Sequence, residues 1–264
     1  RRLRRAARVS LFDEVRRLLA AGEHAVIFTV IEGEPLGAKL VVGDDGGIVS
    51  GDAPGELAEQ ADALIRGGHS RVLEFEGRRV FAEVLGPPPR LLVFGAVDTA
   101  EALCAAAKAL GWTTIVADAR GRFATPDRLP SADEIVVAWP EEVLARVRPD
   151  HATSVVVLTH DDKFDVPALV GALATDAAYI GALGSRRNQT RRREKLIEAG
   201  VEEAQLDRIS GPCGLDIGAD TPAETAVSIL AEIMAVKAGR SGGPLREATT
   251  RIHVEREPET APAS

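Results

Sequence analysis

The spacing of apolar positions changes along the chain, and the change divides the sequence into two parts. From residue 90 onwards, short apolar runs alternate regularly with stretches in which apolar residues recur at helical spacing. Continuous apolar runs are typical of parallel strands buried on both faces, and the helices between them predict right-handed crossovers. This part is therefore expected to be α/β, a Rossmann-like domain with a doubly wound parallel sheet. We expect its strands at 91–94, 113–117, 134–137, 154–158 and 178–183, and its helices at 98–110, 141–146 and 166–173, with long helices after these.

The first part of the chain predicts a smaller α+β domain. Its strand-like runs are rich in β-branched residues, and the last two of them turn at Gly77. An amphipathic helix with apolar positions between residues 11 and 19 precedes these runs. We expect strands at 24–31, 39–42, 71–76 and 78–85, with residues 49–52 leading into a helix at 55–65.

Residues 86–89, Gly-Pro-Pro-Pro, separate the two parts. Three consecutive prolines lack the backbone N–H donors that a helix or a central strand needs, so neither can continue through them. We therefore expect the α+β domain over residues 1–86 and the Rossmann-like domain over residues 90–240. The polar residues 241–264 are expected to form a mobile tail.

Composition excludes several classes of protein. The 264 residues carry 32 Lys and Arg against 40 Asp and Glu, and the formal net charge of −8 argues against a nucleic-acid-coating surface. No apolar run reaches the roughly 18 residues of a membrane span. Cys104 and Cys213 stand far apart without neighbouring Cys or His ligands. We therefore expect no metal site, no disulfide and a reducing compartment, the cytoplasm.

Candidate chemistry lies in the loops that follow the strands, because open parallel sheets bind ligands beyond the carboxyl ends of their strands. A turn placed like a dinucleotide-binding GxGxxG follows the first strand, but Val97 replaces its second glycine. Asp118 follows the second strand, where an acid could bind a ribose or cap the end of the strand. Arg120 beside it could instead pair with a phosphate.

The strongest local signal is the start of the helix after the fifth strand. Ser185 can cap this helix, and the exposed N–H groups together with Arg186 and Arg187 make a natural anion site. The alternative is a solvated, salt-bridged helix start. We expect the basic run at 191–193 to form an exposed helix face.

Two further loops complete this edge of the sheet. His160 follows the fourth strand and could carry a proton, contact a ligand or cap the loop by hydrogen bonds. A Gly-rich loop at 211–219 indicates close backbone approach, and Asp216 within it is expected to hold backbone N–H groups in place. No catalytic residue is predicted. The candidate cofactor-binding residues are Gly95, Ala96, Asp98, Asp118, Arg120, His160, Asp161, Gly184, Ser185, Arg186, Arg187, Gly214 and Asp216.

Three strings of sequence resemble one protein family. They are SVVVLTHD at 154–161, YIGALGSRR at 179–187, and GLDIGA at 214–219 with TPAE at 221–224. In this order they resemble the XdhC/CoxI family of xanthine dehydrogenase accessory proteins, over nearly the whole second domain. The resemblance implies a Rossmann domain, frequent dimerisation, binding of molybdenum cofactor, and delivery of that cofactor to a molybdenum hydroxylase of the xanthine or carbon monoxide dehydrogenase type.

The chain is expected to be a divergent member of this family. Typical members read GAGH at the first turn, where this chain has Val97 and Asp98. The cysteine of their VSGGC string is Ala53 here. These departures fall on positions that the resemblance connects with cofactor handling.

Three functions stay open at this point. The first is a cofactor-binding maturation factor for a molybdenum hydroxylase client, an accessory chaperone rather than a catalyst. Two isolated cysteines cannot build the iron–sulfur clusters of such an enzyme, which favours this function. The second is an NAD(P)-dependent oxidoreductase, suggested by the βαβ unit and Asp118 but opposed by Val97. The third is a regulatory partner protein that has kept the fold and lost the ligand.

Overall fold

The computed structural model describes residues 10–249, and these residues form two compact units. The first unit runs to Pro87 and includes residues 244–249, and the second unit is Pro88–Gly243. Of the tail expected at 241–264, residues 241–249 are exposed and contain a short 3-10 turn, η2 (Leu245–Glu247), while 250–264 lie outside the described residues. None of the helices within residues 10–249 has both the length and the apolar character needed to cross a bilayer.

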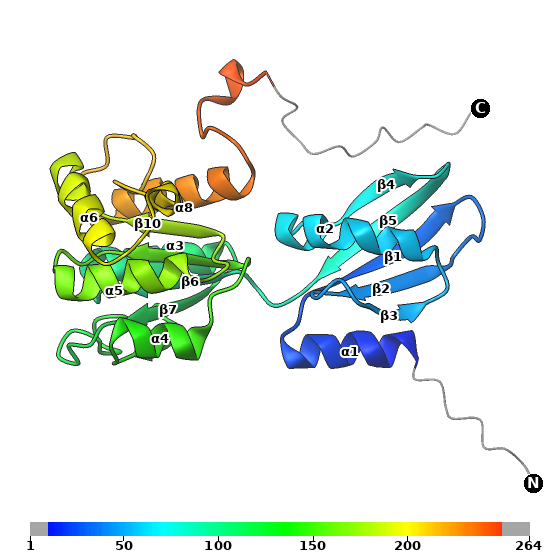
Figure 1. Ribbon diagram of the computed structural model, residues 1–264, viewed down its shortest axis with the longest axis horizontal. Coiled ribbons are helices and arrows are strands. Elements are labelled where there is room, and N and C mark those ends of the chain that lie inside the picture. The colour runs from blue at the N-terminus through cyan, green and yellow to red at the C-terminus, as the bar shows by residue number, and fades with distance from the viewer. Residues whose placement is uncertain (1–9, 250–264) are drawn as a thin grey trace, which may run out of the picture. The chain divides into compact units, whose positions relative to one another are not determined.

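The first unit is a five-stranded antiparallel sheet with the strand order β3-β2-β1-β5-β4 (Figure 1). Its elements are α1 (Leu11–Ala21), β1 (Ala25–Glu32), β2 (Lys39–Gly43), β3 (Ile48–Gly51), η1 (Gly55–Gln60), α2 (Ala61–Gly67), β4 (Arg71–Phe75) and β5 (Arg78–Leu85). Alternate residues of β1 face opposite sides of the sheet, as the period of a strand requires. Phe28 packs with Leu64 of α2, whereas Ile27 packs with Leu18 of α1. The expected α+β domain is confirmed.

Strand β3 is a difference from the sequence prediction. It lies where the pattern predicts only a lead into a helix at 55–65, and that helix is itself divided into η1 and α2. The strand contains Ser50 and Gly51, which have no strong preference for β structure. Its conformation depends on pairing with β2, in which Ser50 lies opposite Val41.

The second unit is a six-stranded sheet in which every strand pair is parallel, with the order β11-β10-β9-β6-β7-β8. This is the strand order of the Rossmann fold, so the predicted doubly wound sheet is confirmed. The elements are β6 (Arg90–Phe94), α3 (Asp98–Ala109), β7 (Thr113–Ala117), β8 (Glu134–Val136), α4 (Pro140–Val147), β9 (Thr153–Val157), α5 (Asp162–Leu173), β10 (Tyr179–Ala182), α6 (Arg186–Glu198), α7 (Glu203–Leu206), β11 (Ile209–Ser210) and α8 (Pro222–Lys237).

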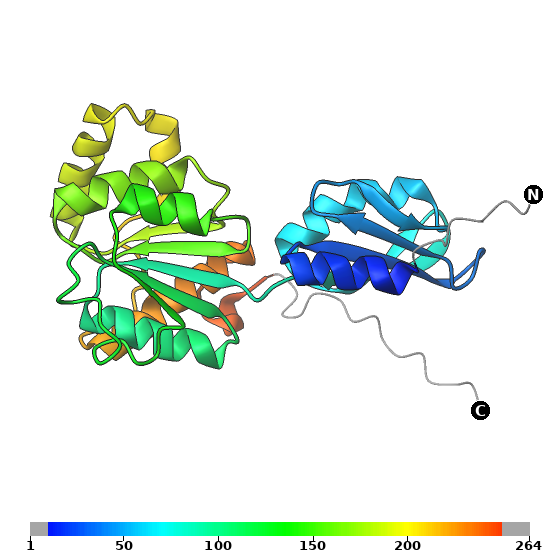
Figure 2. The same cartoon turned by 90° about the horizontal axis from the view of Figure 1, so that it is seen from below.

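Helices cover both faces of this parallel sheet, as Figure 2 shows. The core on one face includes Leu103 of α3 and Ile229 of α8, and α4 to α7 contribute to the core on the other face. Successive residues of β6 alternate between the two cores: Leu91 belongs to the first and Leu92 to the second. Burial on both faces explains why the strands are continuous apolar runs.

Helix α5 begins at Asp162, earlier than the predicted start at residue 166. The carboxylate of Asp161 accepts the backbone N–H of Lys163 at 3.1 Å and thereby caps the helix. Pro167 lies within the helix instead of near its start. Because of this earlier start, Phe164 and Asp165 belong to the first turn of the helix.

Replacing Leu169 by Ala tests the core of the second unit. This side chain of α5 is completely buried in the core that contains Leu92 and Leu196. Leu169→Ala is expected to lower the free energy of unfolding by about 2–5 kcal/mol, because it removes buried methyl groups and leaves a cavity. Urea denaturation followed by circular dichroism measures the change. Ile197→Ala is the control, since Ile197 of α6 is 49% exposed; an equal loss in both variants would contradict the assigned core.

Candidate functional site

The carboxyl ends of the parallel strands lie along one edge of the sheet, and the candidate loops meet there. Strands β6 and β9 are neighbours at its centre, and the chain continues from them in opposite directions, to β7 and to β10. Such a switch point is where open α/β sheets bind ligands. We call the ends of β6 and β7 with their loops the β6–β7 half, and the ends of β9 and β10 with their loops the β9–β10 half.

The turn after β6 is shaped by a close contact with the loop after β9. Gly95 has a φ of +111°, and a Cβ at this position would lie 2.7 Å from Cγ2 of Thr159, so glycine is required. Ala96 is buried. Asp98 begins α3 with an exposed carboxylate, whose Oδ1 lies 3.6 Å from Nη2 of Arg128. This negative charge already compensates the positive end of the helix dipole, so the start of α3 is a poor site for a phosphate.

Asp118 is buried, and its carboxylate binds the chain itself. Oδ2 accepts the N–H of Ala96 at 3.0 Å and Nη2 of Arg120 at 2.8 Å, and Oδ1 accepts the backbone N–H and Nε of Arg120, both at 2.9 Å. Burial alone would raise the pKa of Asp118, but these hydrogen bonds outweigh burial and hold the pKa below its usual value. Both carboxylate oxygens are thus occupied without a ribose.

The start of α6 presents two arginines that have no ion-pair partner in the described part of the chain. Gly184 has a φ of +142°, and the hydroxyl of Ser185 accepts the N–H of Asn188 at 3.3 Å, which caps the helix as predicted. Arg186 and Arg187 are exposed and pair with no carboxylate among residues 10–249, and the first turn contains no acidic residue. The N–H groups, the helix dipole and two guanidinium groups therefore favour an anion here.

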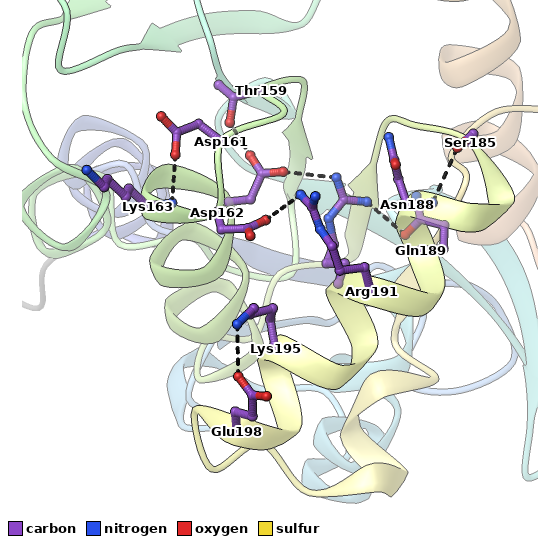
Figure 3. A network of polar contacts seen from close by, with 12 residues as sticks. Thr159, Asp161, Asp162, Lys163, Ser185, Asn188, Gln189, Arg191, Lys195 and Glu198 are labelled. Atoms are coloured by element: carbon purple, nitrogen blue, oxygen red, sulfur yellow. Dashed lines mark hydrogen bonds and ion pairs between the residues drawn. The ribbon is translucent and has the colours of Figure 1, made fainter.

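Later arginines of α6 differ because each has a partner. Nη2 of Arg191 lies 2.9 Å from Oδ1 of Asp162 on α5, as Figure 3 shows. Nη2 of Arg193 lies 3.1 Å from Oε1 of Glu203 on α7. These two residues form the exposed face that the sequence predicts for 191–193, and each makes a salt bridge. Arg192 between them does not belong to this face.

Arg192 is buried, which is a correction to the sequence interpretation. Its Nη2 lies 2.9 Å from Oδ2 of Asp165 and 3.0 Å from the carbonyl oxygen of Leu183, and its Nη1 donates to Oε1 of Gln189 at 2.8 Å. The hydroxyl of Thr159 donates to the same Asp165. Burial raises the pKa of Asp165 even though Thr159 and Arg192 bind its oxygens. This network fixes α6 to α5 and to the loop after β9.

His160 and Asp161 follow Thr159 and are exposed. Asp161 is the cap of α5, so its carboxylate already has a structural role. The imidazole of His160 makes no hydrogen bond to the part of the chain that the structure describes. His160 is therefore available to a ligand at this edge, and the loop-capping role belongs to its neighbour.

The Gly-rich loop after β11 is held by α8 and not by Asp216. Oε2 of Glu232 accepts the N–H of Gly214 at 2.8 Å, and the hydroxyl of Ser228 donates to the carbonyl oxygen of Leu215 at 2.6 Å. Asp216 is exposed and accepts no hydrogen bond from residues 10–249. The expected structural role of Asp216 is therefore wrong. Sequence reasoning missed Glu232 and Ser228, although a Glu and a Ser inside an apolar helix are a usable signal.

The free space differs strongly between the two halves. Beside Asp118 there is about 10 Å³, no more than one water needs. Beside α6, on the side of β11, there is a cavity of about 260 Å³. Its walls are Gln189, Thr190, Arg192, Arg193, Leu196, Leu206, Ile209 and Gly211. An organic ligand therefore has room near α6 and none beside Asp118.

Both cysteines are buried. Burial raises the pKa of the Cys213 thiol to about 12 and that of the Cys104 thiol to about 11. Both thiols are therefore protonated near neutral pH, whereas metals bind the thiolate. Cys104 lies in the core with Leu103.

Two parts of the chain match models of known protein families. Residues 91–233 match the XdhC Rossmann domain, and residues 18–76 match the XdhC and CoxI family. A crystal structure from Bacillus halodurans, described as that of a xanthine dehydrogenase, is similar with a TM-score of 0.64 and 26% sequence identity. The similarity covers 85% of this chain and 65% of that chain.

Three curated proteins are similar in sequence. Uncharacterized protein YqeB of Escherichia coli K12 is 34% identical over 62% of this chain and 30% of its own length. A probable xanthine dehydrogenase subunit of Bacillus subtilis 168 is 33% identical over 59% of this chain and 45% of its own. The molybdenum cofactor insertion chaperone PaoD of Escherichia coli K12 is 29% identical over 57% and 41%. The chain spans less than half the length of these relatives.

Asp118→Asn is expected to lower the free energy of unfolding at pH 7 by about 1.5–3 kcal/mol, because hydrogen bonds to a charged group are weakened. The pKa of Asp118 is lower in the folded than in the unfolded protein. Its contribution is therefore complete above the ordinary value of 3.8 and is lost as the pH falls through the folded value.

Thermal melting of the wild type and Asp118→Asn between pH 7 and pH 3 measures this dependence. The difference between the two proteins is expected to shrink at the acidic end. Asp216→Asn is the control and is expected to melt like the wild type at each pH. A difference for Asp118→Asn that stays constant over this range would show that the carboxylate charge contributes nothing.

Proposed function

Because the chain belongs to the XdhC and CoxI family, we propose that it is an accessory protein that binds molybdenum cofactor as its cargo. It delivers this cargo to a molybdenum hydroxylase client of the xanthine or carbon monoxide dehydrogenase type. The similarity to PaoD, a molybdenum cofactor insertion chaperone, and to a probable subunit of xanthine dehydrogenase supports this role. Cys104 and Cys213 are free thiols, which fits a reducing compartment. The delivery of the cofactor is therefore proposed to take place in the cytoplasm.

The observation that carries the proposal is the start of α6. The pterin of the cofactor bears a terminal phosphate. This helix begins with N–H groups that have no partner among residues 10–249, together with Arg186 and Arg187. Phosphate binds well at such a helix start, and two guanidinium groups add charge-assisted hydrogen bonds. His160 lies exposed on the neighbouring loop and is a further proposed contact of the cargo.

The cavity beside α6 is the proposed place of the pterin ring. Thr190 and Arg193 in its wall follow Arg186 by about one and two helical turns, so they share its helix face. Thr190 lies about 6 Å along the axis from Arg186, from a rise of about 1.5 Å per residue. The volume of about 260 Å³ and the apolar Leu196 and Ile209 suit one face of a heterocycle.

The cargo is proposed to be held by its phosphate and ring, without a thiolate. The structure offers no exposed cysteine among residues 10–249, and Ala53 is buried in the core of the first unit.

A homodimer is part of the proposal. Its support is the apolar, exposed surface of α8, where Val227 and Met234 are 55% and 44% exposed.

Arg186→Ala with Arg187→Ala is expected to reduce the bound cargo at least tenfold. Two charge-assisted contacts are removed, and each contributes about 1.5–3 kcal/mol. The protein is purified from cells with intact cofactor synthesis, and bound pterin is measured by fluorescence after oxidation. Arg191→Ala is the matched control, because Arg191 lies on the same helix but pairs with Asp162.

Two outcomes contradict the proposal. An empty wild-type protein that also fails to bind added cofactor would exclude the cargo itself. A double variant with the pterin content of the wild type would exclude the start of α6 as the phosphate site. The control variant is expected to stay within about fivefold of the wild type, since a single exposed ion pair contributes at most about 1 kcal/mol.

Cys213→Ser is expected to retain the pterin content of the wild type. Burial keeps the thiol protonated, so it does not coordinate the molybdenum. The same fluorescence assay measures the content, and circular dichroism checks that the variant is folded. A folded Cys213→Ser protein without pterin would assign the cargo to the thiolate instead of the start of α6.

A further inference from the structure

Aromatic rings and a guanidinium group form a continuous stack next to the β6–β7 half. The rings of Trp139 and Phe164 are stacked with centroids 4.9 Å apart and an interplanar angle of 18°. Cζ of Arg120 lies 5.2 Å from the ring centroid of Phe164 and 4.8 Å from that of Phe123. We call these four residues the aromatic–arginine stack. They come from the loops after β7 and β8 and from the start of α5.

This stack lies where a Rossmann domain binds the adenosine of a dinucleotide. An acid at the end of the second strand normally binds the adenosine ribose, and Asp118 stands at that position. The space beside Asp118 is closed by Phe164 and by residues of β6, β7 and the loops after β8 and β9. About 10 Å³ remains free, which admits one water and excludes a purine ring.

The side chains of the stack reproduce the contacts that an adenosine would make. Arg120 donates from Nε and Nη2 to the two oxygens of Asp118, where two ribose hydroxyls would donate. Phe164 places a planar ring beside them, where the base would lie. The pair of Asp118 and Arg120 is held further by the stacking of Arg120 on the two phenylalanine rings.

We propose that Arg120 and Phe164 are specificity-determining residues that exclude NAD(P) and other adenine nucleotides, because their own side chains take the place of the adenosine. Two observations outside the stack agree with this. Val97 stands where a dinucleotide needs a glycine, and Asp98 places a negative charge at the helix start that would face the pyrophosphate. The ligand of this domain therefore enters on the β9–β10 side. This inference does not depend on the identity of the cargo.

The test opens the site with Arg120→Ser and Phe164→Ala together and uses adenosine as the probe. Adenosine lacks the phosphates that Val97 and Asp98 oppose, so it reports on the adenosine site alone. Isothermal titration calorimetry is expected to show no saturable binding to the wild type. The double variant is expected to bind adenosine saturably and at least tenfold more tightly than the wild type.

Phe123→Ala is the matched control. Unlike Phe164, Phe123 does not line the space beside Asp118, and unlike Arg120, it does not hydrogen-bond to Asp118. This variant is therefore expected to behave like the wild type. Circular dichroism and thermal melting show whether each variant is folded. If the double variant is unfolded, Phe164→Ala alone is measured against the same expectations.

Three results overturn the inference. The first is saturable binding of adenosine or NADH to the wild type that Asp118→Asn weakens, because the site is then open. The second is a folded Phe164→Ala or double variant that still does not bind adenosine. The third is equal binding to Phe123→Ala and the double variant, which would remove the specific role of Arg120 and Phe164.

Discussion

A buried ion pair holds the β9–β10 half of the edge together. Arg192 of α6 and Asp165 of α5 meet at 2.9 Å with almost no exposure to solvent, and the same guanidinium binds the carbonyl that precedes Gly184. Removing one partner of such a pair leaves an uncompensated buried charge and costs about 3–5 kcal/mol. The position of the start of α6, and of Arg186 and Arg187 on it, depends on this contact between two helices.

The two halves of the edge have the same backbone architecture but opposite properties. In the β6–β7 half, Asp98 brings a negative charge and the side chains fill the space beside Asp118. In the β9–β10 half, two arginines lack acidic partners among the described residues and a cavity of about 260 Å³ lies alongside. A fold supplies places for ligands, but the side chains decide which place is open.

Local signals were sufficient to predict most strands and the cap at Ser185, because a strand period and a cap depend on neighbouring residues. The burial of Arg192 between two exposed arginines could not be predicted in this way. It depends on Asp165, which lies on another helix. The closing of the space beside Asp118 by side chains could not be predicted either, since Phe164 and Trp139 meet only in the folded protein. β3 likewise depends on its pairing with β2.

The position of β6 beside β9 also affects the order in which the strands pair during synthesis. During synthesis β6 can pair with β7 at once, but its other neighbour leaves the ribosome only after β8 and α4. Until then one side of the central strand has unpaired N–H and C=O groups, which is a site for aggregation. Contacts between distant segments also form more slowly than local ones. The edge of the sheet that would bind a ligand is therefore completed late.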